Sequence, residues 1–121
     1  MMKRPDLSME NNFVELASVS SLDDFVAQSN GSAGVLFKHS NSCGVSSRGY
    51  DEMSKLRQPV GLVVVQRARQ VSDEIESRWH VTHETPQVLI VLGGEVVWSA
   101  SHFDVKAQAV ETALQKVSGG Q

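Results

Sequence analysis

Short apolar runs alternate along this chain with stretches in which apolar residues recur every three or four positions. A short continuous apolar run predicts a strand, and the wider spacing predicts an amphipathic helix. The runs that predict strands occupy residues 13–16, 34–37, 60–65, 88–92 and 95–98. The run at 60–65 is rich in β-branched residues, which is typical of a central strand covered on both faces.

Helical spacing fills the intervals between these strands. The predicted helices run from Ser21 to the Asn30-Gly31 pair and over residues 45–57, 71–79 and 104–117. Ser21 and Asp104 have side chains that accept hydrogen bonds from free N–H groups, so we expect them to cap the first and last helices. Gly49 lies inside the second helix, where glycine costs about 1 kcal/mol relative to alanine.

The elements therefore follow the order β-α-β-α-β-α-β-β-α. Two βαβ crossovers require parallel strand pairs, and Gly93-Gly94 forms a tight turn that adds an antiparallel pair. We predict an α/β fold of the thioredoxin-like type, with a mixed central sheet flanked by helices. Residues 1–12 would form a flexible arm, 13–117 the domain and 118–121 a tail.

Composition narrows the possible settings. The 121 residues suffice for one domain, and 11 basic against 14 acidic residues give a net charge of −3. This charge provides no positive field for nucleic acid or an anionic membrane surface. No apolar run approaches the ~20 residues of a membrane-spanning helix, and no apolar segment follows the first residues as in a signal peptide. With one cysteine and no internal disulfide, we expect a reducing cytoplasm.

Cys43, the one cysteine, lies between an apolar run that ends at Phe37 and a helix that begins near Val45. At a helix N-terminus the free N–H groups and the dipole favour the thiolate, which is the reactive form. We expect Gly44, Val45 and Ser46, the first residues of the helix, to stabilise the Cys43 thiolate. The alternative is a small apolar residue in the core, the commoner place for a lone cysteine.

Ser46 stands three residues after Cys43, where dithiol oxidoreductases have a second cysteine. Serine cannot resolve a mixed disulfide, so the available chemistry is exchange through one thiol. Cys43 would take over a small thiol and release it to a second thiol from outside. Ser46 could donate a hydrogen bond to the sulfur, or it could be an ordinary residue of the first helical turn.

The Thr85-Pro86 pair precedes a predicted strand. A proline at the first residue of a strand is a place where the cis isomer is used, although a trans proline can also begin a strand. A cis bond would present the backbone of Thr85 beside Cys43. An extended substrate or a small thiol could pair with that backbone.

The four histidines are His39, His80, His83 and His102. Their spacing does not match a zinc site, so we predict no metal. His83 or His102 could lie near the thiol, contact the substrate or relay a proton; the alternative is two exposed loop residues. A Cys-His hydrolase is not indicated, because no oxyanion or acid-partner motif is present.

Four segments together resemble the monothiol bacilliredoxin family of small thioredoxin-like proteins first labelled general stress proteins. They are Phe37-Lys38-His39-Ser40, Cys43-x-Val45-Ser46-Ser47, His83-Glu84-Thr85-Pro86-Gln87 and Val97-Trp98-Ser99-Ala100-Ser101-His102. The resemblance spans residues 13–117 and implies reduction of mixed disulfides between protein cysteines and bacillithiol in the bacterial cytoplasm. It implies that Cys43 attacks, that Thr85 and Pro86 form the cis-proline element, and that no cofactor is tightly bound.

The family usually has proline directly after the cysteine, where this chain has Gly44. Cys43-Gly44-Val45-Ser46 is also one residue from the Cys-Gly-Phe-Ser signature of monothiol glutaredoxins, which bind glutathione and hold an iron–sulfur cluster between subunits. The Gly-Gly anion site of that family is not evident after Trp98. A non-catalytic thioredoxin-like interaction protein is a third possibility, and both bacillithiol and glutathione stay open as the small thiol.

Overall fold

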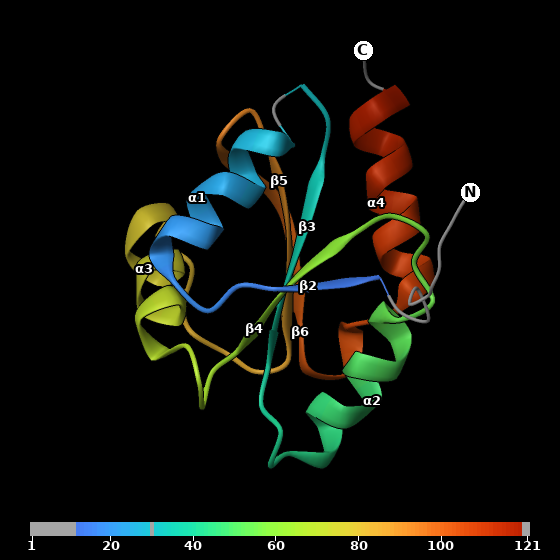
Figure 1. Cartoon of the computed structure of the whole chain (residues 1–121). Coiled ribbons are helices and arrows are strands. Elements are labelled where there is room, and N and C mark those ends of the chain that lie inside the picture. The colour runs from blue at the N-terminus through green and yellow to red at the C-terminus, as the bar shows by residue number, and fades with distance from the viewer. Residues whose placement is uncertain (1–11, 30, 120–121) are drawn as a thin grey trace, which may run out of the picture.

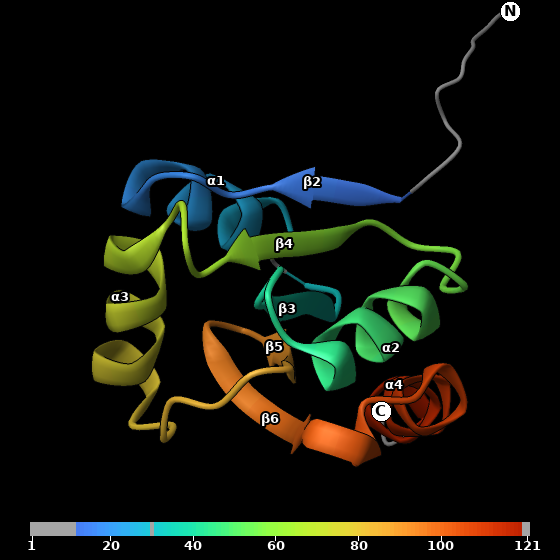
Figure 2. The ribbon, with the colours of Figure 1, turned by 90° about the horizontal axis from the view of Figure 1, so that it is seen from below.

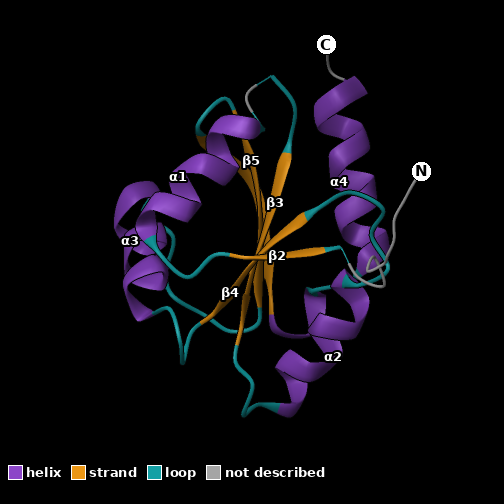
Figure 3. Ribbon diagram, viewed as in Figure 1, coloured by secondary structure: helices purple, strands orange, loops and turns teal. Residues whose placement is uncertain are grey.

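The computed structural model describes residues 12–29 and 31–119. Figures 1 and 3 show one sheet with helices on both faces, and the predicted order of elements is confirmed. The elements are β2 (Phe13–Glu15), α1 (Val19–Gln28), β3 (Gly34–His39), α2 (Gly44–Met53), β4 (Val60–Val64), α3 (Arg69–Trp79), β5 (Gln87–Leu92), β6 (Glu95–Ser101), the 3₁₀ turn η1 (His102–Asp104) and α4 (Ala107–Gly119).

The five strands lie in the order β2-β4-β3-β5-β6. β4 pairs in parallel with both β2 and β3, whereas β5 pairs antiparallel with β3 and β6. All residues of β4 are buried, as its β-branched run predicts for an inner strand. The sheet is mixed, and its parallel part is built by the two crossovers that the sequence indicates.

The two faces of the sheet carry different helices. α1 and α3 cover one face, and α2 and α4 cover the other (Figures 1 and 3). Side chains alternate along β3, so Val35 and Phe37 belong to the core under α2 and α4, while Leu36 belongs to the core under α1 and α3. Lys38 follows the alternation on the side of Leu36.

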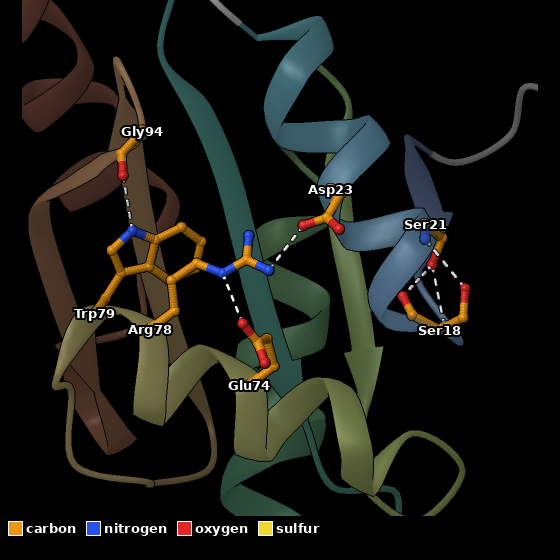
Figure 4. Close-up of polar contacts among 7 residues, drawn as sticks. All are labelled: Ser18, Ser21, Asp23, Glu74, Arg78, Trp79 and Gly94. Atoms are coloured by element: carbon orange, nitrogen blue, oxygen red, sulfur yellow. Dashed lines mark hydrogen bonds and ion pairs between the residues drawn. The ribbon is translucent and has the colours of Figure 1, made fainter.

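Polar contacts at the end of α3 hold this helix to its neighbours on the same face of the sheet (Figure 4). Arg78 donates to Asp23 of α1 at 2.7 Å and to Glu74 of α3 at 2.9 Å. The indole N–H of Trp79 donates to the carbonyl of Gly94, in the β5–β6 turn, at 2.9 Å. α3 is therefore tied both to α1 and to the hairpin.

The N-cap residue of the first helix lies three residues before the predicted one. Ser18 is the N-cap residue of α1, and its hydroxyl accepts a hydrogen bond from the N–H of Ser21 at 3.1 Å. The Ser21 hydroxyl in turn accepts from the N–H of Ser18 at 3.1 Å (Figure 4). The expectation that Ser21 is the cap was wrong, because Ser21 fills the third position of a reciprocal capping box.

Contacts between distant segments set two other helix ends. α2 ends at Met53, whereas the predicted end was residue 57. The side-chain amide of Asn12 donates to the carbonyls of Met53 and Gln58 just after the helix. α4 begins at Ala107, whose N–H donates to a Glu52 carboxylate oxygen at 2.8 Å. Asp104 lies in η1 and does not cap α4, so that expectation was wrong as well.

The remaining boundaries concern the ends of the domain. α4 continues to Gly119, two residues beyond the predicted limit of the domain. The predicted arm lies outside the described residues except for Asn12. Among the helices of the described residues, none combines the length and the apolar character that a membrane crossing needs.

Candidate active site

Cys43 is the N-cap residue of α2 and has extended backbone angles (φ −122°, ψ 128°). Its carbonyl accepts the first helical hydrogen bond, from the N–H of Ser47 at 3.0 Å. The thiol is free and partly exposed, so Cys43 is not a residue of the buried core. Its side chain accepts no capping hydrogen bond from the first turn, so the expected stabilisation of the thiolate by Gly44 and Val45 stays a prediction.

Ser46 is fully buried and faces the sheet. Its hydroxyl oxygen lies 2.8 Å from Nδ1 of His39 and accepts a hydrogen bond from the N–H of Ser40 at 2.9 Å. Burial lowers the pKa of His39, so a neutral imidazole can accept a hydrogen bond from the Ser46 hydroxyl at Nδ1. The expected hydrogen bond from this hydroxyl to Cys43 is therefore not what the structure shows: Ser46 joins α2 to the end of β3.

Gln66 holds the loop that leads to Cys43, a role that no sequence pattern indicated. Its side-chain amide donates to the hydroxyls of Ser40 at 2.9 Å and Ser42 at 3.2 Å. Its carbonyl oxygen accepts from the N–H of Asn41 at 3.2 Å. The loop between β3 and α2 is thus fixed from the turn after β4.

The peptide bond between Thr85 and Pro86 is cis, as predicted. Lys38 pairs with Gln87 across β3 and β5, so Pro86 lies beside the end of β3 from which the cysteine loop departs. Pro86 also packs on α2, because a Cβ added to Gly49 would lie 3.2 Å from the Pro86 Cβ. The cis-proline element and Cys43 therefore belong to the same end of the sheet.

His102 lies beside this element, whereas its expected proximity to the thiol stays a prediction. The backbone N–H of His102 donates to the carbonyl of Pro86 at 2.8 Å, and its ring Nδ1 is 3.6 Å from a carboxylate oxygen of Glu84. The residue has a positive φ of 57°, a left-handed conformation that is uncommon outside glycine. η1 is thereby attached to the loop before β5, although the imidazole itself is exposed.

His83 is held on the opposite face of the sheet from α2. Its Nδ1 lies 2.7 Å from the Lys38 amine and 3.2 Å from the hydroxyl of Ser72 in α3. Lys38 points toward α3, whereas Cys43 begins α2 on the other face. These contacts hold the His83 ring beside Lys38 and Ser72 and do not support the expectation that it lies near the thiol.

Burial lowers the pKa of Lys38 to about 8, against smaller opposing effects of Glu76, Asp73 and Glu84. Burial, followed by the charge of Lys38, also lowers the pKa of His83. Near neutral pH the amine can therefore donate to an uncharged imidazole nitrogen. This interaction fixes the loop that precedes Thr85.

Within the described residues, no group of three or more His, Cys, Asp or Glu side chains could hold a metal ion.

A partly exposed thiol at the start of α2, with a cis proline at the same sheet end, defines a thiol oxidoreductase of the thioredoxin fold. Solved structures are similar to most of the chain. A provisionally assigned oxidoreductase with a thioredoxin fold matches at a TM-score of 0.81 and 26% identity, over 89% of this chain and 98% of the other. Thioredoxin of Fasciola hepatica matches at 0.70 and 13%, over 84% and 96% of the two chains. Thioredoxin of Trypanosoma brucei brucei matches at 0.73 and 12%, over 96% and 99%.

The particular family follows from the sequence. Residues 14–110 match the family model described as monothiol bacilliredoxin BrxC. The chain belongs to this family, and the resemblance noted from its four segments is confirmed.

Proposed function

We propose that this protein reduces mixed disulfides between protein cysteines and a low-molecular-weight thiol, through Cys43. The Cys43 thiolate attacks the sulfur of the small thiol, and the protein cysteine leaves as a thiolate that takes up a proton. A second molecule of small thiol then attacks the adduct on Cys43. The two small-thiol molecules leave as their own disulfide and the Cys43 thiolate is regenerated, so the small thiol is the reductant.

The observation that supports this proposal is a lone, partly exposed cysteine at a helix start, with no second thiol to resolve an adduct. Cys43 is the one cysteine of the chain, and the residue three positions later is a buried serine bonded to His39 and Ser40. Family membership favours bacillithiol as the small thiol, with glutathione as the alternative. A reducing cytoplasm is the setting in which such a thiol would work.

Intact mass spectrometry after exposure to oxidised bacillithiol, or to oxidised glutathione, tests the proposal. We expect one adduct per chain with bacillithiol, its removal by free bacillithiol, and no adduct on the Cys43→Ser variant. Release of a bacillithiol-modified protein cysteine should require Cys43 in the same way. Absence of an adduct with both disulfides would overturn the proposal.

An iron–sulfur carrier is the alternative that the Cys43-Gly44 pair raises. Reconstitution with iron and sulfide under anaerobic conditions distinguishes the two functions. The proposed reductase stays colourless, whereas a carrier would gain visible absorbance that Cys43→Ser abolishes. A non-catalytic interaction protein would instead keep its partners when Cys43 is replaced.

A further inference from the structure

A pocket of about 350 Å³ lies between α2 and η1. Figure 2 shows the short turn after β6 lying next to α2. Val45, Arg48 and Gly49 line the pocket from α2, and His102, Phe103 and Lys106 line it from the η1 segment. We call this space the α2–η1 pocket.

The pocket adjoins the site already described at three points. Val45 is two residues from Cys43, which is about 3 Å along a helix axis. Gly49 packs against Pro86, and the N–H of His102 donates to the Pro86 carbonyl. A small molecule joined to the Cys43 sulfur could therefore extend along this face of α2.

Two cationic side chains of the pocket, those of Arg48 and Lys106, make no direct contact with an acid. Arg48 and Lys106 are exposed, and their side chains form no ion pair or hydrogen bond within the part of the chain that the structure describes. The one acid in the lining, Glu52, has both oxygens engaged: one accepts from Ala107 at 2.8 Å and the other from Lys55 at 2.7 Å. The imidazole of His102 is turned to Glu84. The pocket therefore offers two cationic side chains without a directly bonded acid, of which Lys106 also interacts electrostatically with Glu52.

An exposed aromatic ring adjoins these charges. Phe103 is 62% exposed, more than any other large apolar side chain among the described residues. An apolar surface beside two cations suits an organic carboxylate better than a small inorganic anion, because the organic anion buries carbon as well as charge.

We propose that the α2–η1 pocket binds the carboxylates of the small thiol while that thiol is joined to Cys43, with Arg48 and Lys106 as their partners. This inference rests on the proposed function and names the feature of the small thiol that the protein recognises. Bacillithiol and glutathione both carry carboxylates, so the pocket would select acidic thiols over neutral ones.

Kinetics with two adducts of one substrate protein test the proposal. One adduct carries the acidic thiol that Cys43 accepts, and the other carries neutral 2-mercaptoethanol. For Arg48→Gln and Lys106→Gln we expect KM for the acidic adduct to rise about fivefold to tenfold, with kcat unchanged, since a charge-assisted hydrogen bond is lost. KM for the neutral adduct should stay within about twofold, and Arg48→Lys should recover part of the loss.

Arg57→Gln is the matched control, because it removes the same charge from an exposed arginine just beyond α2 that does not line the pocket. Its KM for both adducts should equal that of the unchanged protein. Equal effects of Arg48→Gln on both adducts, or no effect on either, would overturn the proposal.

A binding measurement keeps this inference separate from the proposed reaction. The S-methyl derivatives of glutathione and bacillithiol have no free thiol and cannot form a disulfide. In an NMR titration we expect saturable shifts of the Val45, Phe103 and Lys106 amides with at least one derivative, lost in the Arg48→Gln/Lys106→Gln double variant. Absence of these shifts with both derivatives would contradict the pocket even if turnover occurs, whereas their presence without turnover would contradict the reaction alone.

Discussion

Lys38 is the residue whose placement departs most from ordinary burial, because its amine is enclosed and its hydrogen-bond partner is an imidazole. The side chain has no exposed surface, and its Nζ lies 2.7 Å from the His83 ring. Burying an ammonium group without a directly bonded carboxylate is unfavourable, which explains why its pKa falls to about 8. The free energy of folding must then change with pH in the alkaline range.

The sign of that dependence follows from proton binding. Lys38 loses its proton near pH 8 when folded and near the ordinary value of 10.5 when unfolded, so between these values the unfolded chain binds more protons. We predict that the free energy of unfolding gains about 2 kcal/mol from this residue as pH rises from 8 to 10.5. Urea unfolding at several pH values measures it. Lys38→Met should remove this rise and the exposed control Lys116→Gln should keep it; identical pH profiles for all three proteins would contradict the prediction.

At the scale of elements, the decisive contact is the one between α2 and the cis-proline segment. Gly49 permits it, because the helix backbone approaches Pro86 and Val105 where a side chain would intervene. The glycine that weakens the helix by local propensity is therefore required by packing. The same contact sets the distance between the start of α2 and the loop before β5.

We predict that Gly49→Ala destabilises the protein by about 1 kcal/mol, or roughly 4 °C in Tm. The added Cβ would lie 3.2 Å from atoms of both Pro86 and Val105, which are buried and cannot easily yield, so crowding outweighs the better helix propensity of alanine. Thermal unfolding followed by circular dichroism measures the change. Gly44→Ala is the matched control, because a Cβ there meets nothing within 4 Å. A Tm for Gly49→Ala at or above that of the unchanged protein would refute the crowding argument.

At the scale of the whole molecule, three segments far apart in sequence form one end of the sheet. The cysteine loop follows β3, the cis-proline loop precedes β5, and η1 follows β6. Gln66 connects the first of these to the turn after β4, and the N–H of His102 connects the third to the second. The order of the cysteine loop thus depends on hydrogen bonds from outside it.

We predict that Gln66→Ala speeds hydrogen exchange of the Asn41 amide about threefold to tenfold, because that N–H loses its acceptor. Exchange at Leu36, in the buried part of β3, should not change. Exchange measured by NMR separates the two effects. Gln70→Ala, an exposed substitution in α3, should leave both rates unchanged, and an unaltered Asn41 rate in Gln66→Ala would show that the loop is ordered without this side chain.

Local pattern sufficed for the elements, for Cys43 at a helix start and for the proline before β5. These features depend on neighbours in sequence, such as periodic apolar positions and the residue types at helix ends. The side-chain partners of Ser46 and His83 could not be predicted, because each is chosen by a strand or helix that folding brings near. The helix ends set by Asn12 and Glu52 could not be predicted for the same reason.

The first turn of α2 has Ser46 where a second cysteine would stand, so it holds no thiol that could discharge a sulfur-bound adduct. If Cys43 works as proposed, the residence time of that adduct follows the abundance of free small thiol around the protein. The share of chains in the loaded form would then rise when that thiol pool becomes oxidised and fall when it recovers. A helix turn without a second thiol would in this way make the protein responsive to the redox balance of its surroundings.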